Sequence, residues 1–227
     1  MESLMTYMAA FGLAAGAGAK AFIPILALGL FSYTPYFELS ARYQWIADPV
    51  VMAVLAALVV AEIVVDAHPD LGRFSDAVAY LPKIVAGFLA FAAVTGRLDQ
   101  DLVQLGASGV LGGGTAAGVH WVRNQMRRPF RDLAEDAHES VGKLASLGEA
   151  GASATMAGTA LVAPPLSMLL LAGFVTTAAV TGRAVERRRA ACVHCGEAVR
   201  TGALVCPHCG RDQVTAPATS EHSTDRR

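Results

Sequence analysis

Apolar residues along the chain gather into long blocks rather than being spread evenly. The blocks are about 16 to 29 residues long, and a helix that crosses a bilayer needs roughly 20 apolar residues, within a usual range of about 17–25. Of the 227 residues, 54% are hydrophobic and only 16% are charged. Soluble domains carry about 25% charged residues. The pattern therefore predicts a multi-pass α-helical membrane protein.

Six segments are predicted to span the membrane. The first four are about 4–31, 50–66, 83–96 and 102–122. The last apolar block, about 152–182, contains Pro164 and Pro165. Prolines inside a helix remove backbone donors and clash with the preceding turn. We therefore divide this region into a fifth helix, about 144–163, and a sixth, about 165–182, with one broken helix over 144–182 as the alternative.

Positive charge gathers on one side of this six-span arrangement. With both ends in the cytoplasm, the segments that face the cytoplasm carry eleven Lys and Arg residues, including Lys83 and Arg123, against Arg42 and Arg97 outside. Cytoplasmic loops of membrane proteins carry such an excess. We therefore expect both the N-terminus and the C-terminus to be cytoplasmic. A cleaved signal peptide is disfavoured, because no Lys or Arg precedes the first apolar run.

Two segments repeat one another. Residues 86–97 read AGFLAFAAVTGR and residues 172–183 read AGFVTTAAVTGR, with nine of the twelve positions identical. They end the third and the sixth predicted spans, so each unit would hold three spans and the second would be inverted. Inverted repeats of three plus three helices occur in transporters, with the site near the midplane between the halves. Chance similarity between Ala-rich and Gly-rich helices is the alternative.

Ionisable residues interrupt the predicted spans. Lys20 lies near the middle of the first span, where a charge costs about 2.5–3.5 kcal/mol, so we expect it to face the bundle interior or water. Pro24 cannot donate to the carbonyl of residue 20, which leaves a backbone oxygen beside the lysine. Glu62 and Asp66 share one helix face, and Glu149 is the repeat counterpart of Glu62. These five residues are predicted to line a polar site between the halves. The alternative places Lys20, Asp66 and Glu149 at the membrane interface.

All four cysteines lie in one stretch, CVHCGEAVRTGALVCPHCG. Two CxxC pairs, separated by ten residues, are typical of a four-cysteine zinc site. A unit this short has almost no core, so the metal must supply its folding energy, on the order of 10 kcal/mol or more. The sequence therefore predicts a structural Zn2+ ion bound by Cys192, Cys195, Cys206 and Cys209. Redox pairs or disulfides are the alternative, which a reducing cytoplasm disfavours.

The fold class that follows is an all-α membrane bundle with a small zinc-ribbon β-hairpin. We predict a transmembrane domain over residues 1–185, a cytoplasmic zinc ribbon over 186–212 and a disordered tail over 213–227. His194 and His208 lie inside the two cysteine pairs. Four thiolates already complete a tetrahedron, so we expect neither histidine to bind the metal.

Three stretches carry a family resemblance: GAGAKAFIPILALGL, WIADPVVMAVLAALVVAEIVVDAHP and LASLGEAGASATMAGTALVAPP. Over roughly residues 10–180 they resemble a bacterial membrane family known as domain of unknown function 4126. The family pattern has an arginine where this chain has Lys20, and a second acid where it has Ala150. The resemblance implies a bacterial inner-membrane protein and brings no known activity. The C-terminal stretch resembles the zinc-ribbon family.

Two functions are compatible with this organisation. In the first, the chain is a small transporter- or channel-like protein for an unknown solute or ion, with the zinc ribbon as a cytoplasmic docking module. In the second, the helices anchor a ribbon that binds a cytoplasmic protein or nucleic acid. The first is favoured, because a plain anchor has no use for buried charge on several helices. No nucleophile–base pair indicates an enzyme, and a homo-oligomer is compatible with the sequence.

Overall fold

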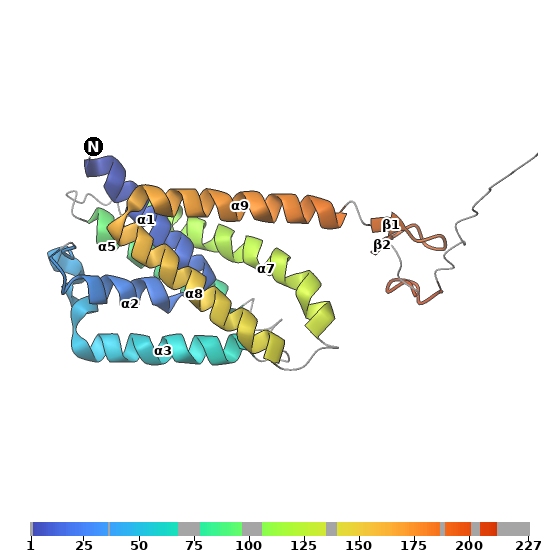
Figure 1. The fold of residues 1–227 in the computed structure, drawn as a ribbon, viewed down its shortest axis with the longest axis horizontal. Coiled ribbons are helices and arrows are strands. Elements are labelled where there is room, and N and C mark those ends of the chain that lie inside the picture. The colour runs from blue at the N-terminus through green and yellow to red at the C-terminus, as the bar shows by residue number, and fades with distance from the viewer. Residues whose placement is uncertain are drawn as a thin grey trace, which may run out of the picture. The chain divides into compact units, whose positions relative to one another are not determined.

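A computed structural model of the chain describes residues 2–35, 37–67, 78–96, 106–134, 140–186, 189–200 and 205–212. The chain forms two compact units, Met1–Ala178 and Ala179–Arg227. The helices, drawn in Figure 1, are α1 (Glu2–Ala19), α2 (Phe22–Phe31), the 3-10 helix η1 (Ala41–Ala47), α3 (Pro49–Ala67), α5 (Tyr80–Thr95), the π-helical turn η2 (Gly109–Gly113), α7 (Gly114–Ala134), α8 (Ser140–Val162) and α9 (Pro164–Glu186).

The first apolar block is not one helix. α1 ends at Ala19, the chain reverses at Lys20 and Ala21, and α2 folds back (Figure 1). A Cβ atom at Gly16 would lie 3.1 Å from Cγ of Pro24. Residues eight apart on a continuous helix are about 12 Å apart along the axis. The prediction of a single span over residues 4–31 is therefore wrong. Pro24 lies in the first turn of α2, where its missing N–H leaves no helical hydrogen bond unmade.

α1 begins at the end of the bundle where α5 ends. The rings of Tyr7 and Phe11 lie 6.3 and 5.1 Å from the ring of Phe91, near the end of α5. The tip of the α1–α2 hairpin lies at the opposite end, where α3 ends and α5 begins (Figure 1). A single unbroken span over residues 4–31 would place the N-terminus at the end of the bundle where α3 ends. In the structure, α1 begins at the opposite end.

Backbone contacts at glycines hold the core helices close together. A Cβ atom at Gly18 would lie 2.5 Å from the carbonyl oxygen of Ala116 in α7, and one at Gly87 would lie 2.6 Å from the carbonyl oxygen of Gly112. Small residues allow helices to approach this closely. The completely buried apolar side chains belong mainly to α1 and α5 and include Ala10, Leu13, Ala14, Ala17, Ala90, Ala92 and Ala93.

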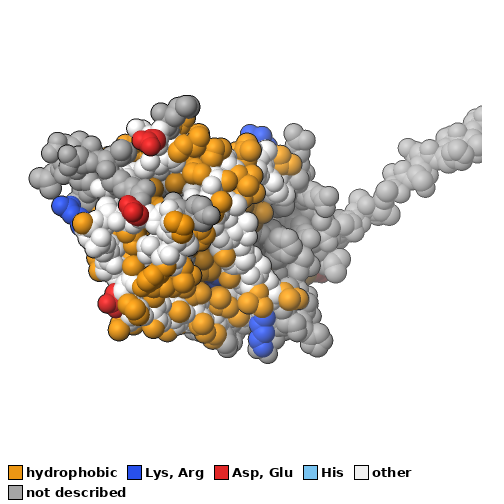
Figure 2. All heavy atoms as spheres, turned by 60° about the vertical axis from the view of Figure 1, so that its left-hand side comes forward, with side chains coloured by type: hydrophobic (Ala, Val, Ile, Leu, Met, Phe, Trp, Pro, Cys, Tyr) orange, Lys and Arg blue, Asp and Glu red, His pale blue; other side chains and the backbone are white. Residues whose placement is uncertain are grey.

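Two of the described helices are long and apolar enough to cross a membrane, Pro49–Ala67 and Pro164–Arg183. Their mean hydropathies are 2.5 and 1.6, and only 6% of each is buried. The large apolar side chains that they expose include Val50, Val54, Val60, Leu169 and Val180. Figure 2 shows hydrophobic side chains over much of the face in view, with few charged ones. An apolar surface of this extent is typical of contact with lipid or with another protein. That the other described helices also cross a membrane remains a prediction.

The two break points of the last block agree with its prolines. α8 ends at Val162 and α9 begins at Pro164, a position in which proline is common because the first helical N–H groups have no partner.

The two segments that repeat one another in sequence are packed differently. Residues 86–96 are largely buried in α5, whereas residues 172–183 are largely exposed in α9. The inverted repeat therefore remains a prediction.

The second unit contains a short antiparallel hairpin. Strand β1 (Arg189–Ala191) pairs with β2 (Ala198–Arg200), and an isolated bridge joins Val205 to Asp212. Each bridge or strand pair closes a turn that carries one cysteine pair. The predicted disordered tail, residues 213–227, lies outside the described residues.

Candidate functional site

Six charged side chains meet at the tip of the α1–α2 hairpin. We call them the ion cluster: Lys20, Glu62, Asp66, Lys83, Arg123 and Glu149. They come from the hairpin tip and from α3, α5, α7 and α8. Three are cations and three are acids, so the charges balance when all six are ionised. Charges can be buried only when they are paired and hydrogen-bonded in this way.

Lys20 is completely buried at the centre of the cluster. Its Nζ atom donates to Oδ2 of Asp66 at 2.7 Å and to Oγ of Ser146 at 3.1 Å. The Ser146 hydroxyl in turn donates to the carbonyl oxygen of Ile63 at 3.0 Å. The ammonium group therefore joins α3 to α8, and the exposed fraction of the Lys20 side chain is 0%.

Arg123 joins two acids from different helices. Its Nη2 atom lies 2.6 Å from Oδ2 of Asp66 and 2.5 Å from Oε2 of Glu149. Asp66 is thus shared by two cations, Lys20 and Arg123. Glu149 lies in the third turn of α8, which begins at Ser140. Charge-assisted hydrogen bonds of this kind are roughly twice as strong as neutral ones.

Side chains of the cluster also satisfy the backbone groups that the helix break sets free. The backbone N–H of Ala21 donates to Oε1 of Glu62 at 3.0 Å. The carbonyl oxygen of Ala19 accepts from Nζ of Lys83 at 2.9 Å. The sequence predicted a free carbonyl oxygen at residue 20. In the structure, the carbonyl oxygen that accepts from a lysine, Lys83, is that of Ala19. Buried backbone N–H and C=O groups at a helix break require such partners.

A histidine completes the site on α7. Nδ1 of His120 lies 3.1 Å from Nζ of Lys83, and Nε2 lies 3.2 Å from Nδ2 of Asn124. The ring of Tyr80 meets the imidazole edge-on at 4.5 Å. His120 is completely buried, and Lys83 is 1% exposed. Lys83 also lies 3.8 Å from Oε1 of Glu62, an ion pair too long for a hydrogen bond.

The structure brings together most of the predicted polar site and adds to it. Lys20, Glu62, Asp66 and Glu149 all belong to the ion cluster. Pro24 does not, since it packs against Gly16 and shapes the hairpin.

Lys83, Arg123 and His120 were missed as site residues. The first two were counted among the charges of cytoplasmic segments, and the structure shows that both side chains are buried. A signal for the third exists in the similarity of AGVH, residues 117–120, to AGAK, residues 17–20.

Some buried polar atoms in the cluster and beside it lack hydrogen-bond partners. Within the described part of the chain, Oε2 of Glu62, Nε of Arg123 and Oδ1 of Asn124 are buried without a hydrogen bond. Most buried polar atoms in proteins are paired, so each exception needs an explanation. The two oxygen atoms can accept a hydrogen bond and the Arg123 N–H can donate one, so a water molecule or a small polar solute would be stabilised at these places.

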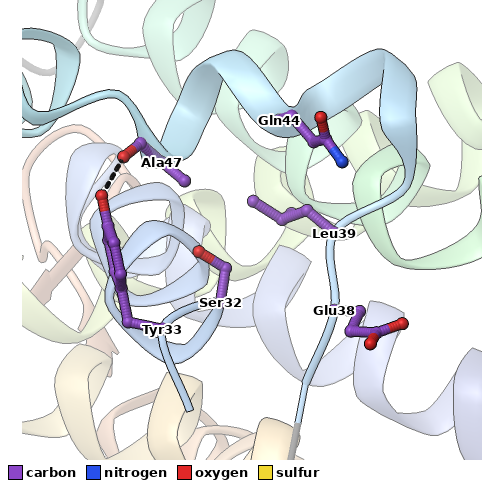
Figure 3. Close-up of a pocket in the computed structure, with 6 residues that line it drawn as sticks. All are labelled: Ser32, Tyr33, Glu38, Leu39, Gln44 and Ala47. Carbon is purple, nitrogen blue, oxygen red and sulfur yellow. Dashed lines mark hydrogen bonds between the residues drawn. The ribbon is translucent and has the colours of Figure 1, made fainter. Parts of the chain in front are cut away.

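A surface pocket lies elsewhere, between the end of α2 and η1 (Figure 3). It has a volume of about 560 Å3 and is lined by Ser32, Tyr33, Glu38, Leu39, Gln44 and Ala47. The Tyr33 hydroxyl donates to the carbonyl oxygen of Ala47 across one side of it. No residue of the ion cluster lines this pocket, and Glu38 is its one ionisable side chain other than tyrosine. It is not the predicted polar site.

The four cysteines of the second unit fit a tetrahedral zinc ion. Their sulfur atoms all lie within 4.8 Å of one another. The Sγ atoms of Cys192 and Cys209 are 3.8 Å apart, and those of Cys195 and Cys206 are 3.7 Å apart. A tetrahedron with Zn–S bonds of about 2.3 Å has sulfur–sulfur edges of about 3.8 Å. The prediction of a four-cysteine structural zinc site is confirmed.

Two matched turns position the thiols. In the first, the N–H of Cys192 donates to the carbonyl of Glu197 and the N–H of Gly196 donates to the carbonyl of Cys192, at 2.8 and 2.9 Å. The second turn repeats both bonds, from Cys206 to Arg211 and from Gly210 to Cys206. The two glycines have φ angles of 75° and 67°, which only glycine adopts without strain.

The crowding of the thiols also affects their acidity. The backbone N–H of Glu197 lowers the pKa of Cys195, but desolvation and hydrogen bonds with the other three cysteines raise it to about 12. A metal cation reverses this tendency, because it binds and stabilises thiolates. The donor set is therefore built for a cation.

Comparison with family models gives two matches. The model described as domain of unknown function (DUF4126) matches residues 7–184. The chain belongs to the DUF4126 family. A second model, described as zinc-ribbon domain, matches residues 189–213. Both resemblances seen in the sequence are thereby confirmed. Neither the curated proteins nor the solved structures give a match. Membership in DUF4126 assigns no activity to the ion cluster.

Proposed function

We propose that this DUF4126 protein is a multi-pass protein of the bacterial inner membrane in which the ion cluster is the polar site of a small transporter or channel. The observation that carries the proposal is the position of Lys20. It lies at a helix break and is bound by side chains from α3 and α8. Broken helices within the membrane are typical of solute and ion sites.

A purely structural role explains the cluster less well. Replacing buried ion pairs by apolar residues of similar volume is often neutral or stabilising, so a simple anchor gains little from them. Ionisable residues within membrane helices generally mark ion pathways, solute sites or proton relays. Six such residues on five segments support a pathway for an ion or a small solute.

The directions of the helices support the inverted repeat as part of this proposal. α2, α3 and α5 run opposite to α7, α8 and α9, respectively (Figure 1). That is the relation an inverted repeat of three plus three helices requires, with α1 as an additional N-terminal helix. The ion cluster draws on both groups of helices, as a site between repeats does.

The path of α1 changes the proposed orientation. α1 and α9 start at the same end of the bundle (Figure 1). A Cβ atom at Gly12 of α1 would lie 2.5 Å from Oγ of Ser167 in the first turn of α9. If the arginine-rich segment after α9 is cytoplasmic, the start of α1 is on the outer side. Reporter fusions to residue 1 and residue 227 test this. We expect activity of an outside-specific reporter at the first and of a cytoplasmic reporter at the second.

Transport is tested with the full chain in liposomes. We expect current on a solid-supported membrane in response to a gradient of at least one small ion or charged solute, among H+, Na+, K+, chloride and small organic acids. The Lys20→Met variant should lose that current, and deletion of residues 190–227 should keep it. A folded chain that passes none of these solutes would contradict the proposal.

A second candidate function has one observation in its favour. The ribbon exposes two valines beside its cysteines, Val193 at 74% and Val205 at 50%. Exposed apolar side chains on so small a unit are compatible with docking to a cytoplasmic protein. In that case deletion of residues 190–227 would abolish function, whereas Lys20→Met would not.

A further inference from the structure

The three acids of the ion cluster are held unequally. Asp66 accepts from two cations, at 2.7 and 2.6 Å. Glu149 accepts from Arg123 at 2.5 Å. Glu62 accepts one described hydrogen bond, from the backbone N–H of Ala21. Its Oε2 atom is buried without a hydrogen bond within the described residues. Of the three carboxylates, Glu62 is therefore the least compensated.

Lys83, the cation nearest to Glu62 among the described residues, does not need Glu62 as a hydrogen-bond partner. The two groups are 3.8 Å apart, whereas Nζ of Lys83 has closer partners in the carbonyl oxygen of Ala19 at 2.9 Å and Nδ1 of His120 at 3.1 Å. A Glu62 that becomes neutral would leave these two bonds in place. The loss of the Glu62 charge therefore does not create an unbonded ammonium group.

His120 is the other basic group available for a proton. Its Nδ1 atom faces Lys83, so a proton there would place two cations about 3 Å apart in a buried site, where repulsion is strong. Of the described groups, the Ala21 N–H and Lys83 contact Glu62 directly. The other charged and titratable groups of the site come from every segment that meets at the hairpin tip: Lys20, Asp66 on α3, Tyr80 on α5, His120 and Arg123 on α7, and Glu149 on α8. Arg123 is held by its own two acids, and Lys20 by Asp66.

We propose that Glu62 is the proton-binding group of the ion cluster. A proton from the aqueous phase adds to Oε2, the carboxylate becomes a neutral carboxyl group, and the cluster passes from balanced charge to one net positive charge. That this proton is the coupling ion of the transport is a role that rests on the proposed function. The bond from the Ala21 N–H then ends on a neutral oxygen and is weaker, which loosens the hairpin tip.

The test is infrared difference spectroscopy on the full chain in lipid, before and after acidification. Besides the signal of the exposed acids, we expect a separate C=O stretching band at the higher frequency typical of a buried carboxyl group. The band should shift when glutamate, and not aspartate, carries a 13C label in its carboxyl group. It should disappear in Glu62→Gln and persist in Glu149→Gln, the matched variant of another acid in the same cluster.

Other results would overturn the proposal. These are the absence of the band in the wild-type chain, its persistence in Glu62→Gln, or its loss in Glu149→Gln alone. If Glu62→Gln does not fold, Glu62→Asp should move the band to the aspartate label, and a band that stays with glutamate excludes Glu62. None of these spectra requires flux. A chain that shows the band but passes no solute would refute the proposed transport and keep the proton site.

Discussion

The zinc ribbon and the ion cluster both bury charge, but they do so in opposite ways. The ribbon gathers four groups of like charge around a dication, and its outer ligands Cys192 and Cys209 are only 17 residues apart. The ion cluster pairs opposite charges from segments as far apart as Asp66 and Arg123, 57 residues in sequence. The ribbon has almost no core without its metal, whereas the cluster lies within an apolar bundle. We therefore expect the ribbon to unfold as a whole when its metal or one ligand is removed. In the cluster, we expect each substitution to cost the stability of the contacts that it removes.

Metal removal should have the largest effect. A chelator, or Cys206→Ser, should unfold residues 189–212, because structural zinc supplies on the order of 10 kcal/mol or more of folding free energy. Zinc content by mass spectrometry and amide chemical shifts report the loss. The helicity of residues 2–178, measured by circular dichroism, should stay unchanged. A ribbon that keeps its dispersed amide shifts without metal would contradict the comparison.

Replacing Lys20 should have the next largest effect. Lys20→Met removes the cation between Asp66 and Ser146 and leaves a buried acid with only one cation. We expect a loss of about 3–5 kcal/mol in the free energy of unfolding, the usual cost of breaking a buried pair. Denaturation in mixed micelles measures it.

The matched control for this variant is Lys143→Met, at an exposed position of α8. An exposed substitution of this kind should change stability by no more than about 0.5 kcal/mol. Equal effects of the two lysine variants would show that burial of Lys20 carries no energetic weight.

A smaller effect is expected from the packing that delivers Lys20 to the cluster. Gly18→Val would place a Cβ atom 2.5 Å from the carbonyl oxygen of Ala116 and should cost about 1–3 kcal/mol, as overpacking does. Gly118→Val on α7 is the control, since a Cβ atom there meets nothing within 4 Å. Thermal melts of both variants in one detergent compare them. Similar melting temperatures would mean that α1 and α7 are not in backbone contact.

The smallest effect is expected at the histidines of the ribbon. His194→Ala and His208→Ala should leave zinc affinity unchanged, because the four thiols already form the tetrahedron. Competition with a chromogenic chelator measures the affinity. A loss as large as that of Cys206→Ser would make one histidine a ligand.

The same contrast explains how much could be predicted. All four zinc ligands could be identified from the sequence, because a turn fixes the spacing of each cysteine pair. Four of the six charges in the cluster could be identified because they interrupt apolar blocks. Lys83 and Arg123 could not, because they lie near predicted helix ends, where positive charge usually faces water. The reversal at Lys20 was missed because the apolar composition continues through it, and composition does not report direction.

The most direct test of the ion cluster is a double-mutant cycle between Lys20 and Asp66. The free energies of unfolding of Lys20→Met, Asp66→Asn and the double variant are compared with that of the wild-type chain. Residues that share a buried ion pair should show a coupling of about 1–3 kcal/mol. The double variant should therefore lose less stability than the two single variants lose together. Additive losses would separate Lys20 from Asp66 and contradict the ion cluster.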